Sequence, residues 1–220
     1  MIYFMTPFWY DCPNPDRYDE LGKCLTKNSR SCFSSNPTAE LVLFSEFTPE
    51  AYVRFSEIRK QKVGCVRLAE SSVRPTYQDF FDYSNRGTTE DLYILANSDI
   101  LIEPDVLEEL DQYVTGDMFL CLTRWIPSAY EGLWSLDPLG KYCQDTWVWR
   151  GPCRIKNANF PLGIPRCDHM IAKVAVDEKY DVRNPSLDIV TKHMHDVEYR
   201  SYTSKDRVDG IGAYVLPRRK

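Results

Sequence analysis

Apolar runs and helical spacings alternate along the first half of the chain. Runs of β-prone residues predict strands at residues 2–5, 41–44, 64–69, 92–96 and 118–123. Apolar residues spaced three and four apart predict helices over about residues 15–30, 49–58, 76–83 and 104–116. Strands that alternate with helices in this way predict an α/β protein with a mostly parallel central sheet and helices on both faces.

The pattern changes after Trp125. Gly, Pro, Trp and Asp become frequent up to Pro165, and the regular alternation of strand and helix is lost. Short strands are predicted around residues 146–149 and 160, a helix over 168–176, and a strand or loop over 191–199. With no internal repeat or linker, we expect a single domain over residues 1–220. Its regularly alternating half would end at about residue 125, and its irregular half would follow.

One stretch, LYILANSDILIEPD at residues 92–105, combines a buried strand with polar residues at its end. An uninterrupted apolar run suits a strand covered on both faces, and open α/β sheets bind ligands at the carboxyl ends of such strands. Asn97, Ser98 and Asp99 would lie at that edge. A carboxylate there could hold a divalent cation together with substrate phosphate oxygens. Alternatively, these polar residues only end the strand, because turns are rich in them.

Two of the three histidines lie close together, as His193 and His195. In a strand, alternate residues share a face, so both imidazoles could point into one site. Neutral histidine is a common metal ligand, and we predict a metal or phosphate role for one of the pair, with His195 favoured. Ordinary hydrogen-bonding histidines are the alternative.

Two further constellations could serve a sugar or its acceptor. Asp168 follows a loop that contains Gly163, where it could act as a general base toward an acceptor hydroxyl, or could simply be a helix N-cap. Gln144 and Asp145 precede Trp147, a combination in which polar groups bind hydroxyls and an indole covers a sugar face. A buried Trp beside a turn Asp would give the same pattern.

Composition excludes some classes of protein. The net charge of −5, from 27 basic and 32 acidic residues, argues against a partner such as nucleic acid or an anionic membrane. No stretch approaches the roughly 18 apolar residues of a membrane span, and the start does not resemble a signal peptide. None of the eight cysteines forms a Cys-x-x-Cys pair, which disfavours a structural zinc site. We expect a reduced, cytoplasmic location. The sequence leaves open the oligomeric state and whether the chain is one domain of a longer protein.

These segments together resemble glycosyltransferases of the GT-A fold, a Rossmann-like fold whose nucleotide-binding half carries an Asp-x-Asp-type motif. The resemblance rests on LANSDI, LTRW, QDTWVW, PLGIPRCDH, NPS and HMH, between about residues 92 and 199. It implies that Asp99 is the metal carboxylate, that Asp168 is the base of an inverting enzyme and that His195 completes the metal shell. The departure is Asn97, which stands where many members have Asp. An amide can still bond a ribose hydroxyl, but the site carries one charge fewer.

The resemblance implies metal-assisted transfer, with Mn²⁺ or Mg²⁺, of a sugar from a UDP- or GDP-sugar to a hydroxyl of a glycan or other acceptor. The half up to about residue 125 would bind the nucleotide sugar, and the half from about residue 126 would bind the acceptor. The donor site would comprise Thr6, Pro7, Phe8, Arg67, Arg74, Asn97, Ser98 and Asp99. The acceptor or sugar site would comprise Arg124, Gln144, Asp145, Trp147, Gly163 and His193. Arg74 or Arg124 could also assist the leaving diphosphate. A sugar nucleotidyltransferase is an alternative, although the segment after the first strand, TPFWYDCPNP, has neither Gly nor Lys. A non-catalytic sugar- or nucleotide-binding module is another.

Overall fold

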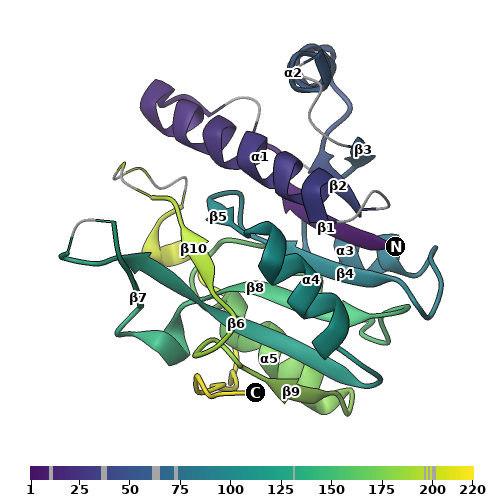
Figure 1. Cartoon of the computed structure of the whole chain (residues 1–220). Helices are drawn as coiled ribbons and strands as arrows, with labels where there is room; N and C mark the ends of the chain where they lie inside the picture. Colours follow the sequence, from purple (N-terminus) through teal and green to yellow (C-terminus); the bar gives the residue numbers. More distant parts are fainter. Residues whose placement is uncertain are drawn as a thin grey trace.

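A computed structural model describes residues 1–9, 12–35, 39–60, 65–71, 74–130, 132–195, 197, 199 and 202–220. Strands and helices alternate through the first half, as the sequence predicts (Figure 1). The strands are β1 (Ile2–Pro7), β2 (Ala39–Ser45), β3 (Cys65–Glu70), β4 (Leu92–Ala96), β5 (Ile100–Leu101), β6 (Met118–Pro127), β7 (Trp134–Leu136), β8 (Gln144–Arg150), β9 (Asp181–Arg183) and β10 (Thr191–His193). The helices are α1 (Pro15–Ser35), α2 (Pro49–Lys60), α3 (Tyr77–Ser84), α4 (Pro104–Tyr113) and α5 (Cys167–Asp177), with short 3₁₀ turns at Gly140–Tyr142 and Ser204–Asp206.

The central sheet is mixed but mostly parallel, and it curls back on itself. Its strand order is β3-β2-β1-β4-β8-β6-β10-β5, with β7 and β9 paired to β6. The first four strands run parallel, and β8 lies antiparallel between β4 and β6. Only residues 97–99 separate β4 from β5 in the chain, yet β5 stands at the far end of this order. The sheet therefore curves until its last strand returns beside the end of β4.

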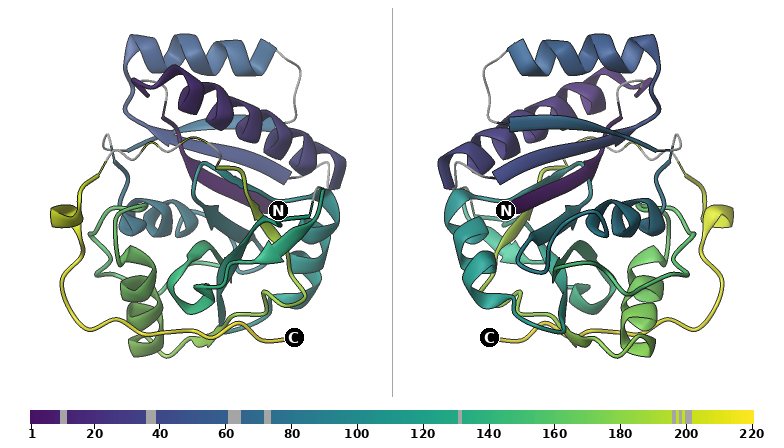
Figure 2. Two further views of the ribbon diagram at one scale, coloured as in Figure 1. Left: turned by 90° about the vertical axis from the view of Figure 1, so that its left-hand side faces the viewer. Right: turned by 90° about the vertical axis from the view of Figure 1, so that its right-hand side faces the viewer.

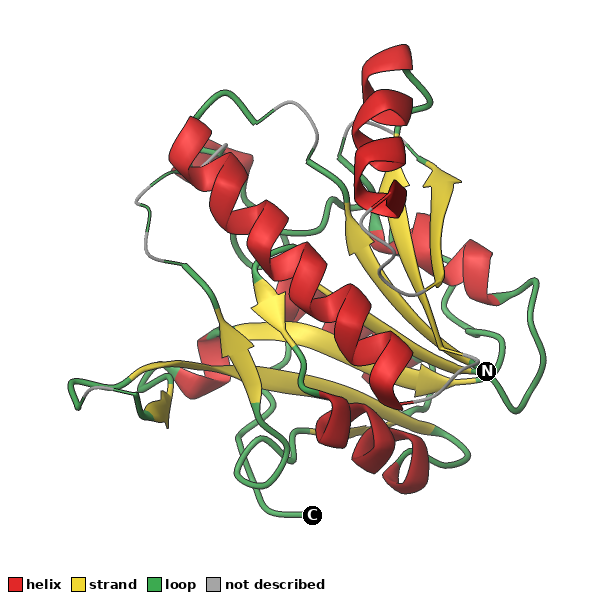
Figure 3. Cartoon of the chain, turned by 45° about the horizontal axis from the view of Figure 1, so that its top comes forward, coloured by secondary structure: helices red, strands yellow, loops and turns green. Residues whose placement is uncertain are grey.

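Helices cover both faces of the sheet, and each face has its own core. On one face α1 and α4 pack over an aliphatic cluster, and Figure 3 shows these two helices in front of the sheet. On the other face α3 and α5 pack over a cluster rich in aromatic rings, and in Figure 2 these two helices lie across the sheet from α4. Neighbouring residues of β4 divide between the two clusters, with Ile94 in the first and Tyr93 and Leu95 in the second. This alternation follows from the two-residue repeat of a strand, and it explains why the run is apolar throughout.

Several boundaries and one predicted element differ from the sequence prediction, with the largest extensions in α1 and β6. Helix α1 continues to Ser35, past the predicted end near Arg30. β6 continues to Pro127 because its outer half pairs with β7 and β10. The predicted strand at Phe160 is wrong. That residue lies in a loop, where its backbone oxygen accepts a hydrogen bond from Tyr77 N (3.2 Å) and its ring packs against that of Tyr77. The predicted turn at residues 36–37 and the start of the third strand at residue 64 lie outside the described residues.

A buried side chain fastens the short strand β5 to helix α1. Asn28 donates from Nδ2 to the backbone oxygen of Ile100 (2.7 Å) and accepts at Oδ1 from the backbone nitrogen of Ile102 (3.0 Å). Its amide therefore takes both hydrogen bonds that a neighbouring strand would otherwise supply. Because β5 directly follows Asp99, this contact also fixes the end of the polar segment. Among the described helices, none has the length and apolarity needed to cross a bilayer.

Candidate functional site

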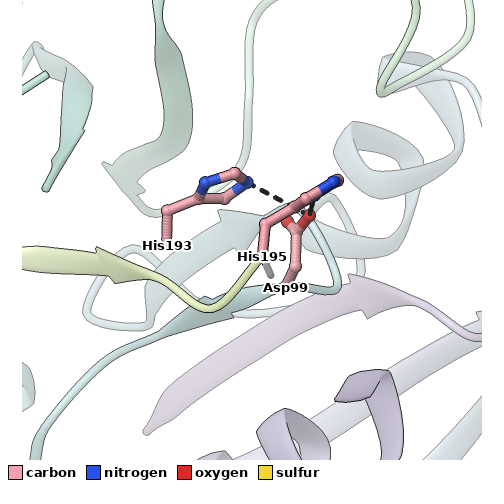
Figure 4. Close-up of side chains that lie close together, drawn as sticks. All are labelled: Asp99, His193 and His195. Carbon is pink, nitrogen blue, oxygen red and sulfur yellow. Dashed lines mark hydrogen bonds and ion pairs between the residues drawn. The ribbon is translucent and has the colours of Figure 1, made fainter. Parts of the chain in front are cut away.

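Strand pairing brings the histidine pair to Asp99, although 94 and 96 positions separate the residues in sequence. β10 runs antiparallel to β5, with His193 opposite Ile100. One residue further on, Met194 N donates to the backbone oxygen of Asp99 (2.8 Å). His193 and His195 therefore flank that contact on the same side of the chain, as two-residue alternation predicts. Figure 4 shows both imidazoles directed at the Asp99 carboxylate.

The three side chains form a compact set of metal-binding groups. His193 Nε2 and His195 Nδ1 each lie 3.2 Å from Asp99 Oδ2, and the three candidate ligand atoms lie within 4.8 Å of one another. The side chains are mostly buried, with 11 to 17% of their surface exposed. One carboxylate and two imidazoles suit a first-row divalent cation. The chemistry of these donors therefore fits a metal ion.

The surroundings of the Asp99 carboxylate favour its ionised form. Burial alone would raise its pKa, but hydrogen bonds from His193 and His195, together with the charges of His193 and Arg17, outweigh burial and hold the pKa well below its usual range. An ionised carboxylate is ready to bind a cation without first losing a proton.

Arg17 is a member of this cluster that the sequence did not reveal. It lies in the first turn of α1, only 10% of its side chain is exposed, and its two terminal nitrogens bond Asp99 Oδ2 and Glu20 Oε2. The sequence offered one weak signal for Arg17, namely a basic residue among acidic residues at the start of the first helix. Such a mixture of charges is common on solvent-exposed helix faces. The position of Arg17 next to Asp99 depends on packing between segments 82 residues apart.

A cavity of about 480 Å³ opens over this cluster and reaches Asp168. Of the residues predicted from sequence, it is lined by Pro7, Asn97, Ser98, Asp99, Arg124, Gln144, Asp145, Gly163, Asp168, His193 and His195. It thus unites both predicted halves of the site. Lining residues that the sequence did not single out include Arg17, Trp9, Tyr142 and Arg166.

On the donor side, the polar residues after β4 are held by specific contacts. Ser98 Oγ donates to the backbone oxygen of Pro7 (3.0 Å), which joins the ends of β4 and β1. Asn97 donates from Nδ2 to Asp145 Oδ1 (2.7 Å). Arg74 lies over the ring of Trp9, 5.4 Å from its centroid, and so borders the cavity through that ring.

Besides Arg74, three predicted donor residues are not among the described lining residues. Thr6 is buried within β1, and Phe8 packs against the aliphatic core. Arg67 pairs with Glu40 of the neighbouring strand (3.0 Å). The prediction placed these residues at the nucleotide because they end or flank strands, whereas the alternation of side chains along the strand turns them elsewhere.

On the acceptor side, three predicted residues, Arg124, Asp145 and Gln144, are engaged in internal contacts. Arg124 forms ion pairs with Asp137 and Asp145, both at 2.9 Å. Gln144 donates from Nε2 to the backbone oxygen of Val215 (3.1 Å), which fastens the C-terminal segment. These contacts organise the wall of the cavity, and they reduce the capacity of Arg124 to bind a further anion.

The structure contradicts the assignment of Trp147 as a sugar-stacking residue. Its side chain is fully buried in the aromatic core, and its ring meets that of Tyr77 edge-on at 5.0 Å. The alternative interpretation, a buried Trp beside a polar pair, is the one that the structure supports. Among the described lining residues, Trp9 is the tryptophan.

Asp168 lies in the first turn of α5, with 12% of its side chain exposed. It is not the N-cap, which is Arg166 in a left-handed conformation (φ 72°). Burial, and then the charge of Asp145, raise the pKa of Asp168 to about 7, although backbone hydrogen bonds partly offset them. A carboxylate with a pKa near neutrality is well suited to accept a proton.

Comparison with known proteins identifies the fold. No protein-family model and no curated protein matches the chain. Among solved structures, it is similar to a mannosyltransferase from Pyrobaculum calidifontis in complex with GDP-Man and Mn²⁺ (TM-score 0.54, 14% identity, covering 91% of this chain and 58% of that one). It is also similar to TarS from S. aureus in complex with UDP-GlcNAc (TM-score 0.55, 12% identity, 90% of this chain and 61% of that one).

A third similar structure is 4-diphosphocytidyl-2C-methyl-D-erythritol synthase from Anaerococcus prevotii (TM-score 0.52, 10% identity, 94% of this chain and 92% of that one). The chain spans about three-fifths of the length of the two glycosyltransferases. These likenesses establish a GT-A-like fold, as the sequence predicts.

Proposed function

We propose that the chain transfers a sugar from a nucleoside-diphosphate sugar, such as a UDP- or GDP-sugar, to a hydroxyl of a glycan or other acceptor. The observation that carries this proposal is that three side chains able to hold a metal ion and a carboxyl with a pKa of about 7 line one cavity. Its support in the fold is that the cavity lies at the carboxyl ends of β1 and β4, where open α/β sheets bind ligands. The similar glycosyltransferase structures were solved with GDP-Man and Mn²⁺ or with UDP-GlcNAc.

On the donor side, Asp99, His193 and His195 would hold the cation. Two imidazoles favour Mn²⁺ or another first-row transition ion over Mg²⁺, which prefers oxygen ligands. The ion would supply positive charge for the leaving diphosphate. Asn97 and Ser98 would bind the nucleotide beside it, on the side of the cavity formed by β1 and β4.

On the acceptor side, Asp168 would be the general base. Its carboxylate would take the proton of the acceptor hydroxyl while that oxygen forms a bond to the anomeric carbon and the bond to the diphosphate oxygen breaks. Attack opposite the leaving group inverts the configuration at that carbon. Gly163, in the loop before α5, would leave room for the acceptor, since it has a positive φ of 76° and no side chain.

The experiment is a donor screen followed by matched variants. The wild-type chain is incubated with a panel of nucleotide sugars and Mn²⁺, and released nucleoside diphosphate is measured with and without saccharide acceptors. Asp99→Ala should weaken binding of both Mn²⁺ and the donor. Asp168→Asn should keep donor binding and lose transfer by about 10²–10⁴-fold.

The control variant is Asp177→Asn, which removes an exposed carboxylate from the same helix as Asp168. It should leave transfer unchanged. Near-normal transfer by Asp168→Asn would contradict its role as the base and would point to a retaining mechanism. If no donor is bound or cleaved, the proposed function is wrong.

A second candidate, a sugar nucleotidyltransferase, is favoured by one observation. The similar synthase from Anaerococcus prevotii is matched over 92% of its length, far more than the glycosyltransferases. Incubation with nucleoside triphosphates and sugar phosphates distinguishes the two, because only a nucleotidyltransferase would release pyrophosphate. Donor binding without turnover in either assay would instead indicate a binding module.

A further inference from the structure

Arg17 bonds the oxygen of the Asp99 carboxylate that the two histidines also approach. Arg17 Nη2, His193 Nε2 and His195 Nδ1 all contact Asp99 Oδ2. A guanidinium has no lone pair with which to bind a cation, so Arg17 cannot be a metal ligand. It is instead a positive charge placed where a divalent cation would also have to approach the carboxylate.

Arg17 and a cation would therefore compete for Asp99. Close approach of a divalent cation to the carboxylate adds repulsion between two like charges in a mostly buried site, where screening by water is weak. Binding of the cation alone must either tolerate this repulsion or move Arg17 off Oδ2. A guanidinium moved in this way keeps Glu20 as a partner but loses Asp99.

A diphosphate would remove this conflict. Arg17 lines the cavity, and its planar fork of donors is suited to phosphate oxygens. Once the cation has taken Asp99, the diphosphate offers the displaced guanidinium a new anionic partner. Each ligand would then improve the binding of the other, because thermodynamic coupling between two sites is reciprocal.

We propose that Arg17 couples the cation to the nucleoside diphosphate: its guanidinium neutralises Asp99 in the free protein and pairs with the diphosphate when a cation takes that carboxylate. This inference rests on the proposed function, because it needs both a cation and a diphosphate in the cavity. It assigns a role to a residue of α1 that is neither a metal ligand nor the base.

The test measures Mn²⁺ binding rather than turnover. Free Mn²⁺ is followed by electron paramagnetic resonance during titration of the protein, alone and with saturating UDP or GDP, after correction for Mn²⁺ bound by the nucleotide in solution. In the wild-type chain the nucleotide should tighten Mn²⁺ binding by roughly 5–150-fold, the usual range of such coupling. In Arg17→Ala, binding of Mn²⁺ alone should become tighter, and the gain from the nucleotide should fall below that of the wild type, to what the direct attraction between cation and diphosphate supplies.

Two further variants test whether a change in Mn²⁺ binding by Arg17→Ala comes only from damage to the structure. Arg17→Lys keeps the charge but loses the fork, and it should retain part of the coupling. Arg30→Ala removes an exposed arginine from the same helix and changes the net charge equally, so its Mn²⁺ binding should match the wild type. In chelator, Arg17→Ala should melt at a lower temperature than the wild type, and saturating Mn²⁺ should raise its melting temperature by more than it raises that of the wild type.

The failures of the two proposals are distinguishable. If the wild-type chain binds UDP or GDP and Arg17→Ala retains the wild-type coupling, the role of Arg17 is wrong while the proposed function stands. The same conclusion follows if Arg17→Ala binds Mn²⁺ alone more weakly than the wild type does. If the wild-type chain binds no nucleoside diphosphate, the proposed function is wrong and the coupling proposal fails with it.

Discussion

Replacement of Asp168 by asparagine should make the protein more stable at neutral pH, although it should remove the proposed base. Burial and the charge of Asp145 raise the pKa of Asp168 from 3.8 to about 7. The folded protein therefore resists ionisation of this carboxyl, while the unfolded chain ionises it freely. Asparagine has nearly the same shape and no charge, so it removes that penalty.

The sign and size follow from proton linkage. Between pH 4 and 7 the folded state keeps the Asp168 proton and the unfolded state has lost it, so this carboxyl lowers stability as the pH rises through that window. A difference of about three pKa units, at 1.36 kcal/mol each, corresponds to roughly 4 kcal/mol above pH 7. The amide oxygen of the introduced asparagine can keep the hydrogen bond that Asp168 Oδ1 accepts from His169 N (2.9 Å). We expect a net gain on the order of 3 kcal/mol at pH 8.

The assay is urea unfolding of the wild type and Asp168→Asn at intervals from pH 4 to 8.5, in chelator so that no cation alters the charges. The free energies of unfolding should agree near pH 4 and diverge steadily up to about pH 7. Asp177→Asn, on the exposed side of α5, should show no comparable divergence. A constant difference between the wild type and Asp168→Asn across the whole range would refute the reasoning, because it would mean that folding does not shift this pKa.

The remaining predictions address catalysis, the contact between α1 and β5, the C-terminal segment and the metal site. Transfer by the wild type should rise with pH through about pH 7, since Asp168 must be ionised to act as the general base. A rate that is flat from pH 5.5 to 8.5 would exclude Asp168 as the base. Asn28→Ala should lower the free energy of unfolding by about 2–6 kcal/mol in urea titrations, because it leaves two buried backbone groups of the β5 segment unpaired at about 1–3 kcal/mol each. Gly212→Ala should lower the melting temperature, because a Cβ there would lie 2.5 Å from His169 Cβ and 3.0 Å from its backbone; an unchanged melting curve would show that the segment shifts freely. His195→Ala should weaken Mn²⁺ binding in calorimetry by at least about tenfold, and undiminished affinity would remove it from the metal site.

Local sequence determined the secondary structure and the class of fold. The apolar residues of β1, β2 and β4 form unbroken runs because both faces of these strands are covered. In the helices between them, apolar residues recur every three or four positions because only one face of each helix is buried and the other meets solvent. Parallel strands joined by right-handed helical crossovers leave few arrangements, so the position of Asp99 at the ligand-binding edge followed from the order of elements. The alternation of His193 and His195 likewise placed both imidazoles on one side.

Only the tertiary structure decided which side chains meet. Trp147 belongs to a strand whose two faces are both apolar, so the sequence could not tell whether its ring would face the core or a sugar. Arg124 neutralises Asp137 and Asp145, and the charge of Asp145 also raises the pKa of Asp168. These residues meet although they come from separate segments of the chain.

The same limit applies to the cluster around Asp99. Arg17 and Asn28 reach this region because α1 packs across β5, a contact between segments more than 70 residues apart. Periodicity reports which face of a helix is buried, but it does not report which partner that face will meet. The sequence therefore determined the fold and the place of the site, while packing at long range decided its electrostatics.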